Sequence, residues 1–286
     1  MFKFALYKLG LFFLNRFSTH TSYKLAALIT DIQYFCSFRD RKAVQNNLRS
    51  ILPNSSNVSV HAREVFRNFG RYLVEFFKMD KMLDEQFIKD KIQVNGIKHL
   101  DDALKRGKGG IIITAHIGNW ELGAVLLSVL GYPLMAVALP HKERPVNDLF
   151  NQQREAKGVT VVPMNTAVRQ CMEQLKANKL IALVADRDFS AHGIVMDFLG
   201  RKMLIPKGPA MFSWKTGAPI IPVFCIRGED GNFIMSCHEP LYPPNRNTSI
   251  DEDAIVMGIM RRYVPIIEEQ IRTYPSQWLL FREIFV

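Results

Sequence analysis

Apolar residues follow two different patterns along the chain, and the change lies near residue 95. Before that point they recur at helical spacing, which predicts helices over residues 22–38, 40–51 and 60–79. The last of these helices carries one apolar face, made of Phe66, Phe69, Leu73, Phe76 and Phe77. The pattern therefore predicts a helical N-terminal region over residues 1–95.

After residue 96, short apolar runs alternate with stretches of helical periodicity. Strands are predicted at residues 110–115, 134–138, 159–162, 180–185, 220–226 and 233–237. Helices are predicted at residues 120–130, 144–157, 166–177, 206–216 and 251–273, and Ser249 is the N-cap expected for the last of them. Such alternation is typical of a parallel sheet covered on both faces. We expect an α/β fold over residues 96–286, with a mostly parallel central sheet flanked by helices, to which the helical region is appended or continuous.

The first 17 residues are rich in leucine and phenylalanine, but Lys3, Lys8 and Arg16 interrupt them. The uncharged runs are much shorter than the ~20 apolar residues that a membrane-spanning helix needs. No small-residue cleavage site follows, so a signal peptide is not expected. The segment is either a helix in the membrane interface or an amphipathic helix packed on the domain. Its aromatic residues and lysines favour a membrane-associating region.

The formal net charge is +10 and the sequence pI is about 9.5. This balance favours anionic partners such as lipid headgroups, acidic proteins or nucleic acid. No recognised nucleic-acid-binding motif is present, so we expect no nucleic acid partner. Arg63, Arg67 and Arg71 recur at steps of four on one helix, where they face either solvent or lipid phosphates.

The cysteines and histidines show no metal-binding spacing. Cys36, Cys171, Cys225 and Cys237 form no CxxC pair, and no HExxH is present. This cysteine usage suits a reducing compartment rather than a disulfide scaffold. We expect neither a metal nor a cofactor.

The segment over residues 110–131 has the form strand, histidine, capped helix. The apolar strand ends at His116, Asn119 is a good N-cap, and Glu121 lies in the first turn of the next helix. Ligands of open α/β sheets bind at the carboxyl ends of strands. A histidine whose other ring nitrogen donates to a carboxylate is held in one tautomer and can accept a proton. We therefore predict His116 as a general base assisted by Glu121.

The same histidine-to-acid spacing occurs at His192 and Asp197. No strand leads into His192 and no capped helix follows it. We interpret His192 as a loop residue near the site, because the strand and helix around His116 are what distinguish the first motif.

The segment His116 to Glu121, HIGNWE, resembles the H-x-x-x-x-[D/E] motif of glycerolipid-type acyltransferases. It is most similar to the lipid A late acyltransferase family, which includes lauroyl and myristoyl transferases and related mycobacterial mannoside acyltransferases. Further blocks of that family are matched, in order, by Asn147, Phe150, Asn151 and Arg154, by residues 185–188, by residues 198–201 and by residues 206–209. The resemblance extends over most of the chain.

The resemblance implies a role for His116 and Glu121, and the roles of the other matched residues are inferred from their chemistry. His116 and Glu121 would form the catalytic dyad. Arg154 would bind phosphate or polarise a carbonyl, as a guanidinium suits oxyanions. Asp186 and Asp188 would either orient Arg154 or the acceptor, or form a purely structural turn. The substrate-binding residues expected are Asn119, Arg154, Asp186, Asp188 and Arg201, with Lys207 beside Arg201 as a contact for an anionic headgroup.

Two positions depart from the family pattern. Arg187 stands where an Asp-Gln-Asp block has glutamine, and the C-terminal block over residues 277–282 lacks the usual histidine and ends in Arg282. Both departures bear on the acceptor more than on the reaction.

The resemblance implies a membrane-associated O-acyltransferase at the cytoplasmic face of the inner membrane. The donor would be an acyl thioester of acyl carrier protein or coenzyme A, and the acceptor an anionic membrane lipid. The hydroxyl of a lipid A precursor or related glycolipid is expected, with a lysophospholipid as the alternative. A basic membrane-binding protein without activity is the non-enzymatic alternative. A serine hydrolase and a nucleotide enzyme are disfavoured, because the chain has no G-x-S-x-G, G-x-G-x-x-G or P-loop.

Overall fold

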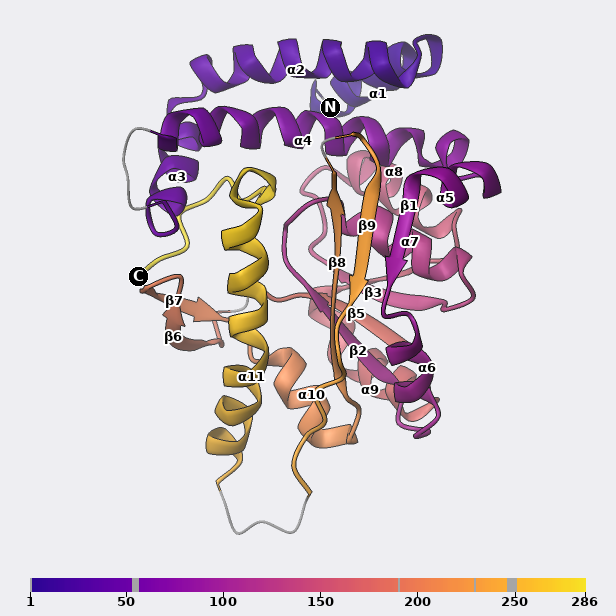
Figure 1. Ribbon diagram of the computed structural model, residues 1–286, viewed down its shortest axis with the longest axis vertical. Helices are drawn as coiled ribbons and strands as arrows, with labels where there is room; N and C mark the ends of the chain where they lie inside the picture. Colours follow the sequence, from indigo (N-terminus) through magenta and orange to yellow (C-terminus); the bar gives the residue numbers. More distant parts are fainter. Residues whose placement is uncertain (1, 53–56, 190, 229, 246–250) are drawn as a thin grey trace.

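The computed structural model describes residues 2–52, 57–189, 191–228, 230–245 and 251–286. Helices cover both faces of a central sheet, and the N-terminal helices lie above it (Figure 1). The N-terminal helices are α1 (Phe2–Arg16), α2 (Thr19–Cys36), α3 (Phe38–Arg49), α4 (Val58–Met82) and α5 (Glu85–Lys91). The later helices are α6 (Lys98–Leu104), α7 (Trp120–Val129), α8 (Arg144–Glu155), α9 (Ala167–Lys176), α10 (Gly208–Thr216) and α11 (Glu252–Thr273). Two short 3-10 turns are η2 (Met164–Thr166) and η3 (Pro275–Gln277).

The main sheet has seven strands in the order β1-β9-β8-β2-β5-β3-β4. Their bounds are β1 (Ile92–Asn95), β2 (Gly110–Thr114), β3 (Leu134–Ala138), β4 (Thr160–Pro163), β5 (Leu180–Val184), β8 (Ile220–Arg227) and β9 (Phe233–Cys237). All neighbouring strands pair in parallel except β8 and β9, which are antiparallel. The predicted α/β class with a mostly parallel sheet is confirmed.

Alternate residues of the central strand β2 face opposite cores. Ile111 and Ile113 are fully buried in the core that includes side chains of α9, α10 and α11. Ile112 faces the core that α4, α6, α7 and α8 cover. A strand buried on both faces must be apolar throughout, which explains the continuous run of isoleucines.

Two elements differ from the sequence-based expectation. The strand β1 lies within the region predicted to be helical, and it pairs with β9 at the edge of the sheet. Residues 194–205 form a separate hairpin of β6 (Ile194–Phe198) and β7 (Arg201–Ile205). Its two turn residues, Leu199 and Gly200, have φ of 52° and 80°, the positive values that two-residue hairpin turns require.

Of the two helix caps predicted from the sequence, the structure describes one. The Asn119 side chain accepts a hydrogen bond from the Leu122 backbone N–H at 2.9 Å, so it caps α7 as expected. The cap predicted for the last helix, Ser249, lies outside the described residues. Asp251 caps α11 instead, because its carboxylate accepts from the backbone of Asp253 at 3.1 Å.

The arginine stripe of α4 is partly exposed, and two of its three members pair with α2. Arg63 and Arg67 both bind the Asp31 carboxylate, with N–O distances between 2.7 and 2.9 Å. Arg71 binds Glu64 on its own helix at 2.5 Å. Arg63 and Arg67 therefore fasten α2 to α4, and the three arginines share two carboxylates, Asp31 and Glu64.

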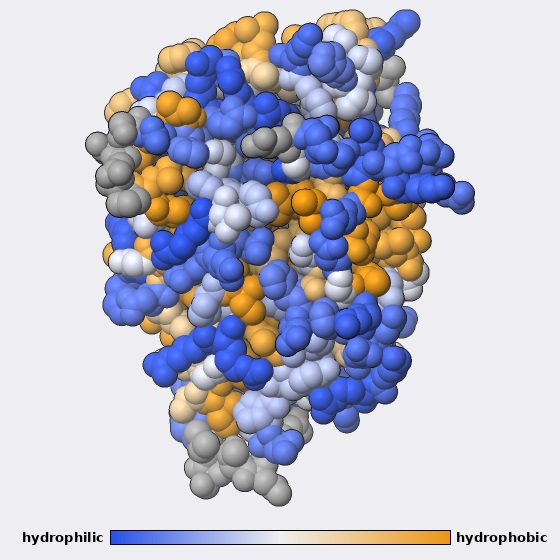
Figure 2. Space-filling view, viewed as in Figure 1, coloured by the Kyte–Doolittle hydropathy of each residue, from blue (hydrophilic) through white to orange (hydrophobic). Residues whose placement is uncertain are grey.

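The outer side of α1 and α2 carries an apolar face. On α2, Leu28, Ile29, Ile32 and Phe35 are each more than half exposed (60%, 56%, 57% and 62%). On α1 and just after it, exposed apolar residues are Leu9, Phe12, Phe13 and Phe17. Figure 2 shows apolar atoms at the top of the molecule, where Figure 1 places these helices. None of the described helices is both long enough and apolar enough to cross a membrane.

Candidate active site

The His116 imidazole is held by Asp186. The register of β2 and β5 pairs Thr114 with Val184, so the residues two positions further on leave the sheet side by side. His116 Nδ1 lies 2.8 Å from Asp186 Oδ1, and the His116 backbone N–H donates to Asp186 Oδ2 at 3.1 Å. The carboxylate therefore fixes the ring and leaves Nε2 as the nitrogen that can accept a proton.

Asp186 is fully buried and ionised. The indole N–H of Trp278 donates to its Oδ2 at 2.8 Å. Burial alone would raise the pKa of Asp186, but the charge of His116 and the hydrogen bonds from His116 and Trp278 outweigh burial and hold that pKa below its usual value. Trp278 is a partner that the sequence motifs did not indicate.

The loop after His116 is fixed by its neighbours on both sides. The backbone of Leu279 donates to the His116 carbonyl at 2.6 Å, and the backbone of Asn119 donates to the Cys225 carbonyl at 2.8 Å. Gly118 has φ of 61°, and a Cβ there would lie 2.1 Å from the Cys225 carbonyl oxygen. Only glycine fits this close approach.

Glu121 does not pair with His116, so the predicted contact within the motif is wrong. Its carboxylate binds the Arg154 guanidinium in two places, Nε to Oε2 at 2.9 Å and Nη2 to Oε1 at 2.5 Å. Their side chains are only 10% and 11% exposed. Both carboxylate oxygens of Asp186 are bonded to His116 or Trp278, so Asp186 does not bind Arg154. The reason is geometric, because the α7 turn directs Glu121 toward α8 whereas Asp186 is adjacent to His116 across the sheet.

A buried polar network lies behind the motif. Glu75 of α4 is fully buried and binds Arg227 of β8 through two contacts of 2.7 Å. The Asn119 amide donates to Glu75 at 2.7 Å, and the Tyr23 hydroxyl donates to it at 2.9 Å. Asn119 is itself fully buried with both amide atoms engaged in hydrogen bonds within the protein, and that it binds substrate stays a prediction. Its contacts hold the loop in place.

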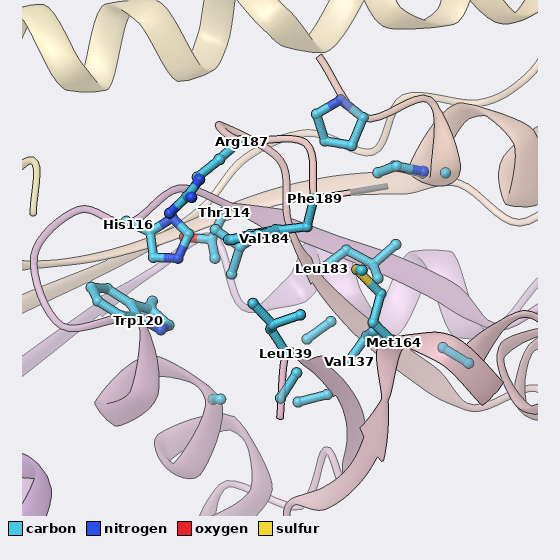
Figure 3. Close-up of a pocket in the computed structure, with 18 of the residues that line it drawn as sticks. Thr114, His116, Trp120, Val137, Leu139, Met164, Leu183, Val184, Arg187 and Phe189 are labelled. Carbon is cyan, nitrogen blue, oxygen red and sulfur yellow. The ribbon is translucent and has the colours of Figure 1, made fainter. Parts of the chain in front are cut away.

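A cavity of about 740 Å³ opens beside His116 (Figure 3). Figure 3 places His116, Trp120 and Arg187 on one side and Val137 and Met164 on the other. Most lining side chains are apolar and come from α4, the sheet, α9 and α10, among them Phe69, Leu73, Ala136, Leu139, Val168, Met172, Leu183, Met211 and Phe212.

Several polar side chains also line this cavity. Arg154, Arg187, Asp188, His192 and Lys207 are among them, so the structure brings Asp188 and the loop histidine to the same space as His116. The Thr114 hydroxyl is buried and has no hydrogen-bond partner among the described residues.

Arg201 does not line this cavity, and its expected role in substrate binding stays a prediction. It begins β7, is exposed, and stacks on the Phe285 ring with 4.3 Å between guanidinium carbon and ring centroid. It lines a separate small cavity with Asn46 and Glu283. The hairpin turn at residues 199–200 directs this strand away from His116.

Within the described part of the chain, no group of three or more His, Cys, Asp or Glu side chains is arranged to hold a metal ion. The donor set around His116 consists instead of one imidazole and one buried carboxylate. This arrangement can remove a proton from a hydroxyl group that enters the cavity.

The fold and site define the class: an α/β protein with a histidine–aspartate pair at the carboxyl edge of parallel strands, bordering an apolar cavity. Residues 3–285 match the family described as bacterial lipid A biosynthesis acyltransferase. The chain belongs to that family and is an O-acyltransferase, which confirms the resemblance read from the sequence. The family implies an acyl donor and a lipid acceptor.

The individual relatives agree with this assignment. The chain is 31% identical over 220 residues to a phosphatidylinositol mannoside acyltransferase of Mycolicibacterium smegmatis, covering 76% of this chain and 69% of that protein. It is 27% identical over 261 residues to the protein of that name from Mycobacterium tuberculosis, with 88% and 79% covered. A lipid A biosynthesis acyltransferase of Haemophilus influenzae is 21% identical over 68% of this chain and 60% of its own.

Among solved structures, a 1-acyl-sn-glycerophosphate acyltransferase from Thermotoga maritima is similar at 16% sequence identity and a TM-score of 0.38. The similarity covers 86% of this chain and 98% of that one. It is a distant similarity.

Proposed function

We propose that this protein transfers a fatty acyl chain from an acyl thioester to a hydroxyl group of a membrane glycolipid, with His116 as the general base and Asp186 as the residue that holds it. The observation that supports this most directly is the 2.8 Å contact between His116 Nδ1 and the buried Asp186, on the edge of a large apolar cavity.

The reaction follows from the free nitrogen of His116. Nε2 accepts the proton of the acceptor hydroxyl while the hydroxyl oxygen attacks the thioester carbonyl. The ester bond forms as the carbon–sulfur bond breaks, and the leaving thiolate takes the proton back from the imidazolium. Asp186 stabilises the imidazolium in between, because its charge is desolvated and directly bonded to the ring.

The apolar cavity suits the acyl chain. Burying a hydrocarbon chain contributes about 0.8 kcal/mol for each CH₂ group removed from water. The methionines Met164, Met172 and Met211 lie along this lining, and their flexible side chains can adapt to a chain of variable shape.

The Arg154–Glu121 pair has a second role in this proposal. Glu121 occupies two edges of the guanidinium, and Arg154 still borders the cavity. Glu121 thereby positions a permanent positive charge, which can polarise the thioester carbonyl. Glu121 acts through Arg154 and not through His116.

The relatives favour a glycolipid acceptor over a lysophospholipid. The mycobacterial proteins are named for acylation of a phosphatidylinositol mannoside, and the Haemophilus protein for lipid A biosynthesis. Both names describe glycolipids. The donor thioester is carried by acyl carrier protein or coenzyme A.

Membrane association fits the exposed apolar face of α1 and α2. This face groups aromatic and aliphatic side chains on two neighbouring helices, which suits burial in the interfacial region of a bilayer. The enzyme would then work at the cytoplasmic face of the inner membrane.

The test is mass spectrometry of total lipids from cells with and without the gene. We expect one lipid class to lose a single acyl chain when the gene is absent. Wild-type protein should restore that chain, whereas His116→Ala at equal abundance should not. An unchanged lipid profile in the deletion strain, or full restoration by His116→Ala, would contradict the proposal.

A further inference from the structure

Two arginines, Arg187 and Arg282, depart from the family pattern, and Arg187 lines the cavity. Arg187 follows Asp186 directly, is half-buried and lines the cavity. Figure 3 shows its side chain extending toward the His116 ring. Its guanidinium carbon lies 4.3 Å from the centroid of the Phe189 ring. This stacking restrains the guanidinium in position.

Arg282 stands near the end of the chain, three residues after Leu279, which lines the same cavity. The segment before it runs beside the His116 loop, with Trp278 bridged to Ile117 and the Leu279 backbone bonded to the His116 carbonyl. Burial and the nearby charge of Arg282 both lower the pKa of Arg187. The two guanidinium groups therefore repel each other.

No carboxylate neutralises this pair in the described part of the chain. The cavity's other arginine, Arg154, is matched by Glu121, but neither Arg187 nor Arg282 has an ion-pair partner among the described side chains. Asp186 affects Arg187 through its charge alone and spends its oxygens on His116 and Trp278. Two adjacent positive groups without a counterion are an arrangement that an anion stabilises.

We propose that Arg187 and Arg282 form a subsite for the phosphate group of the acceptor lipid. This rests on the proposed function and deepens it, because it assigns a phosphorylated headgroup to the acceptor. A guanidinium binds two phosphate oxygens at once, and a phosphate between the two arginines relieves their repulsion.

The position favours the acceptor over the donor as the source of this phosphate. A donor carries its phosphate at the far end of a long pantetheine arm, well away from the reacting sulfur. A phosphorylated headgroup can place phosphate and hydroxyl within a few bonds of each other. The Arg187 side chain extends toward the base that must reach that hydroxyl.

The experiment measures binding by calorimetry, so that it does not depend on turnover. The probes are dihexanoyl phosphatidic acid and dihexanoylglycerol, which differ by the phosphate alone. We expect the wild-type protein to bind the phosphate-bearing probe at least about tenfold more tightly, the size of one charge-assisted hydrogen bond. Arg187→Gln and Arg282→Gln should each remove most of that preference, and Arg187→Lys should retain part of it.

A matched control separates this subsite from general charge. Arg261 is exposed on α11, where its guanidinium contacts Met257 of the same helix. Arg261→Gln removes the same charge and should leave the preference unchanged. The proposal is overturned if Arg187→Gln keeps the wild-type preference, or if Arg261→Gln loses as much.

Two further arms separate the possible failures. Coenzyme A and pantetheine serve as the donor probes with and without the distal phosphates. Arg187→Gln should leave the ratio of their binding affinities unchanged. If it weakens only coenzyme A and spares phosphatidic acid, the assignment to the acceptor is wrong. The His116→Ala variant should keep the phosphate preference, so a failure of the catalytic proposal leaves this result readable.

Discussion

The two ends of one short motif are held in different ways. His116 pairs with Asp186, which is fully buried and comes from the neighbouring strand. Glu121, five residues later, pairs with Arg154 of α8. Only about a tenth of each of these two side chains is exposed. The first pair fixes a group that exchanges protons, and the second fixes a permanent charge.

This difference shows that motif spacing does not imply contact. His116 and Glu121 are close in sequence, but each binds a different partner. Both partners, Asp186 and Arg154, lie more than 30 residues further along the chain. We therefore expect that disrupting the first pair lowers mainly the catalytic rate. Disrupting the second pair should lower both activity and stability.

Asp186→Asn should have the largest catalytic effect. The amide cannot stabilise the imidazolium, so kcat should fall by about 10²–10⁴-fold, the range of general-base catalysis. Steady-state kinetics with an acyl thioester would measure this. Asp188→Asn, two residues away in the same loop, should cost much less. Equal losses in the two variants would mean that Asp186 has no special relation to His116.

Glu121→Gln should lower both activity and stability. It leaves the Arg154 guanidinium in a mostly buried site without its counterion, which costs about 3 kcal/mol or more. Denaturant unfolding would measure the loss. Adding Arg154→Met should recover part of the stability but not the activity. A stability equal to that of wild type in Glu121→Gln would show that the pair contributes nothing to the fold.

Trp278→Phe should have a smaller effect on the first pair. It removes one hydrogen bond to Asp186, which contributes about 1.5–3 kcal/mol for a charged acceptor and so up to about a hundredfold in kcat. It should also raise the pKa of Asp186 toward its ordinary value. In the wild type the folded-state pKa is depressed, so the ionised carboxylate contributes stability above the ordinary pKa that is lost as pH falls through the folded-state pKa.

The acid limb of the stability curve tests that sign. The free energy of unfolding is measured from pH 7 down to pH 2. The ionised Asp186 should contribute less to it in Trp278→Phe, and that contribution should be lost at a higher pH than in the wild type. An identical acid limb in the two proteins would contradict the role given to Trp278.

Substitutions on the apolar face of α1 and α2 should leave both pairs intact. The double variant Leu28→Gln and Phe35→Gln should bind anionic vesicles more weakly, because each substitution removes exposed apolar surface from this face. The kcat with water-soluble substrates should stay unchanged. Val195→Gln, an exposed valine on β6, is the control. Vesicle binding equal to that of wild type in the double variant would exclude this face as the membrane contact.

Local patterns in the sequence predicted the setting of His116 but not its partner. The strand, the Asn119 cap and the α7 helix depend on neighbouring residues, so periodicity and capping preferences located them. The Asp186 contact depends on β5 lying beside β2, which no local pattern encodes. Once that strand order is known, the pairing of Thr114 with Val184 places the two side chains together.

The buried network was missed for a different reason. Glu75 stands in the run Val74-Glu75-Phe76-Phe77 of a helix that is buried almost all round. A carboxylate in such a run requires a buried partner, and this signal was present in the sequence. The hairpin of β6 and β7 was not visible in the same way, because Leu199 takes a positive φ that usually marks glycine or asparagine.

The most direct test of the central claim is the single-turnover rate of acyl transfer to the lipid identified by mass spectrometry. The rate is followed for wild-type protein and for His116→Ala, with circular dichroism to show that both are folded. We predict that ester formation and thiol release fall together by at least about 10²-fold in His116→Ala. A folded His116→Ala protein that forms the ester at the wild-type rate would contradict the account.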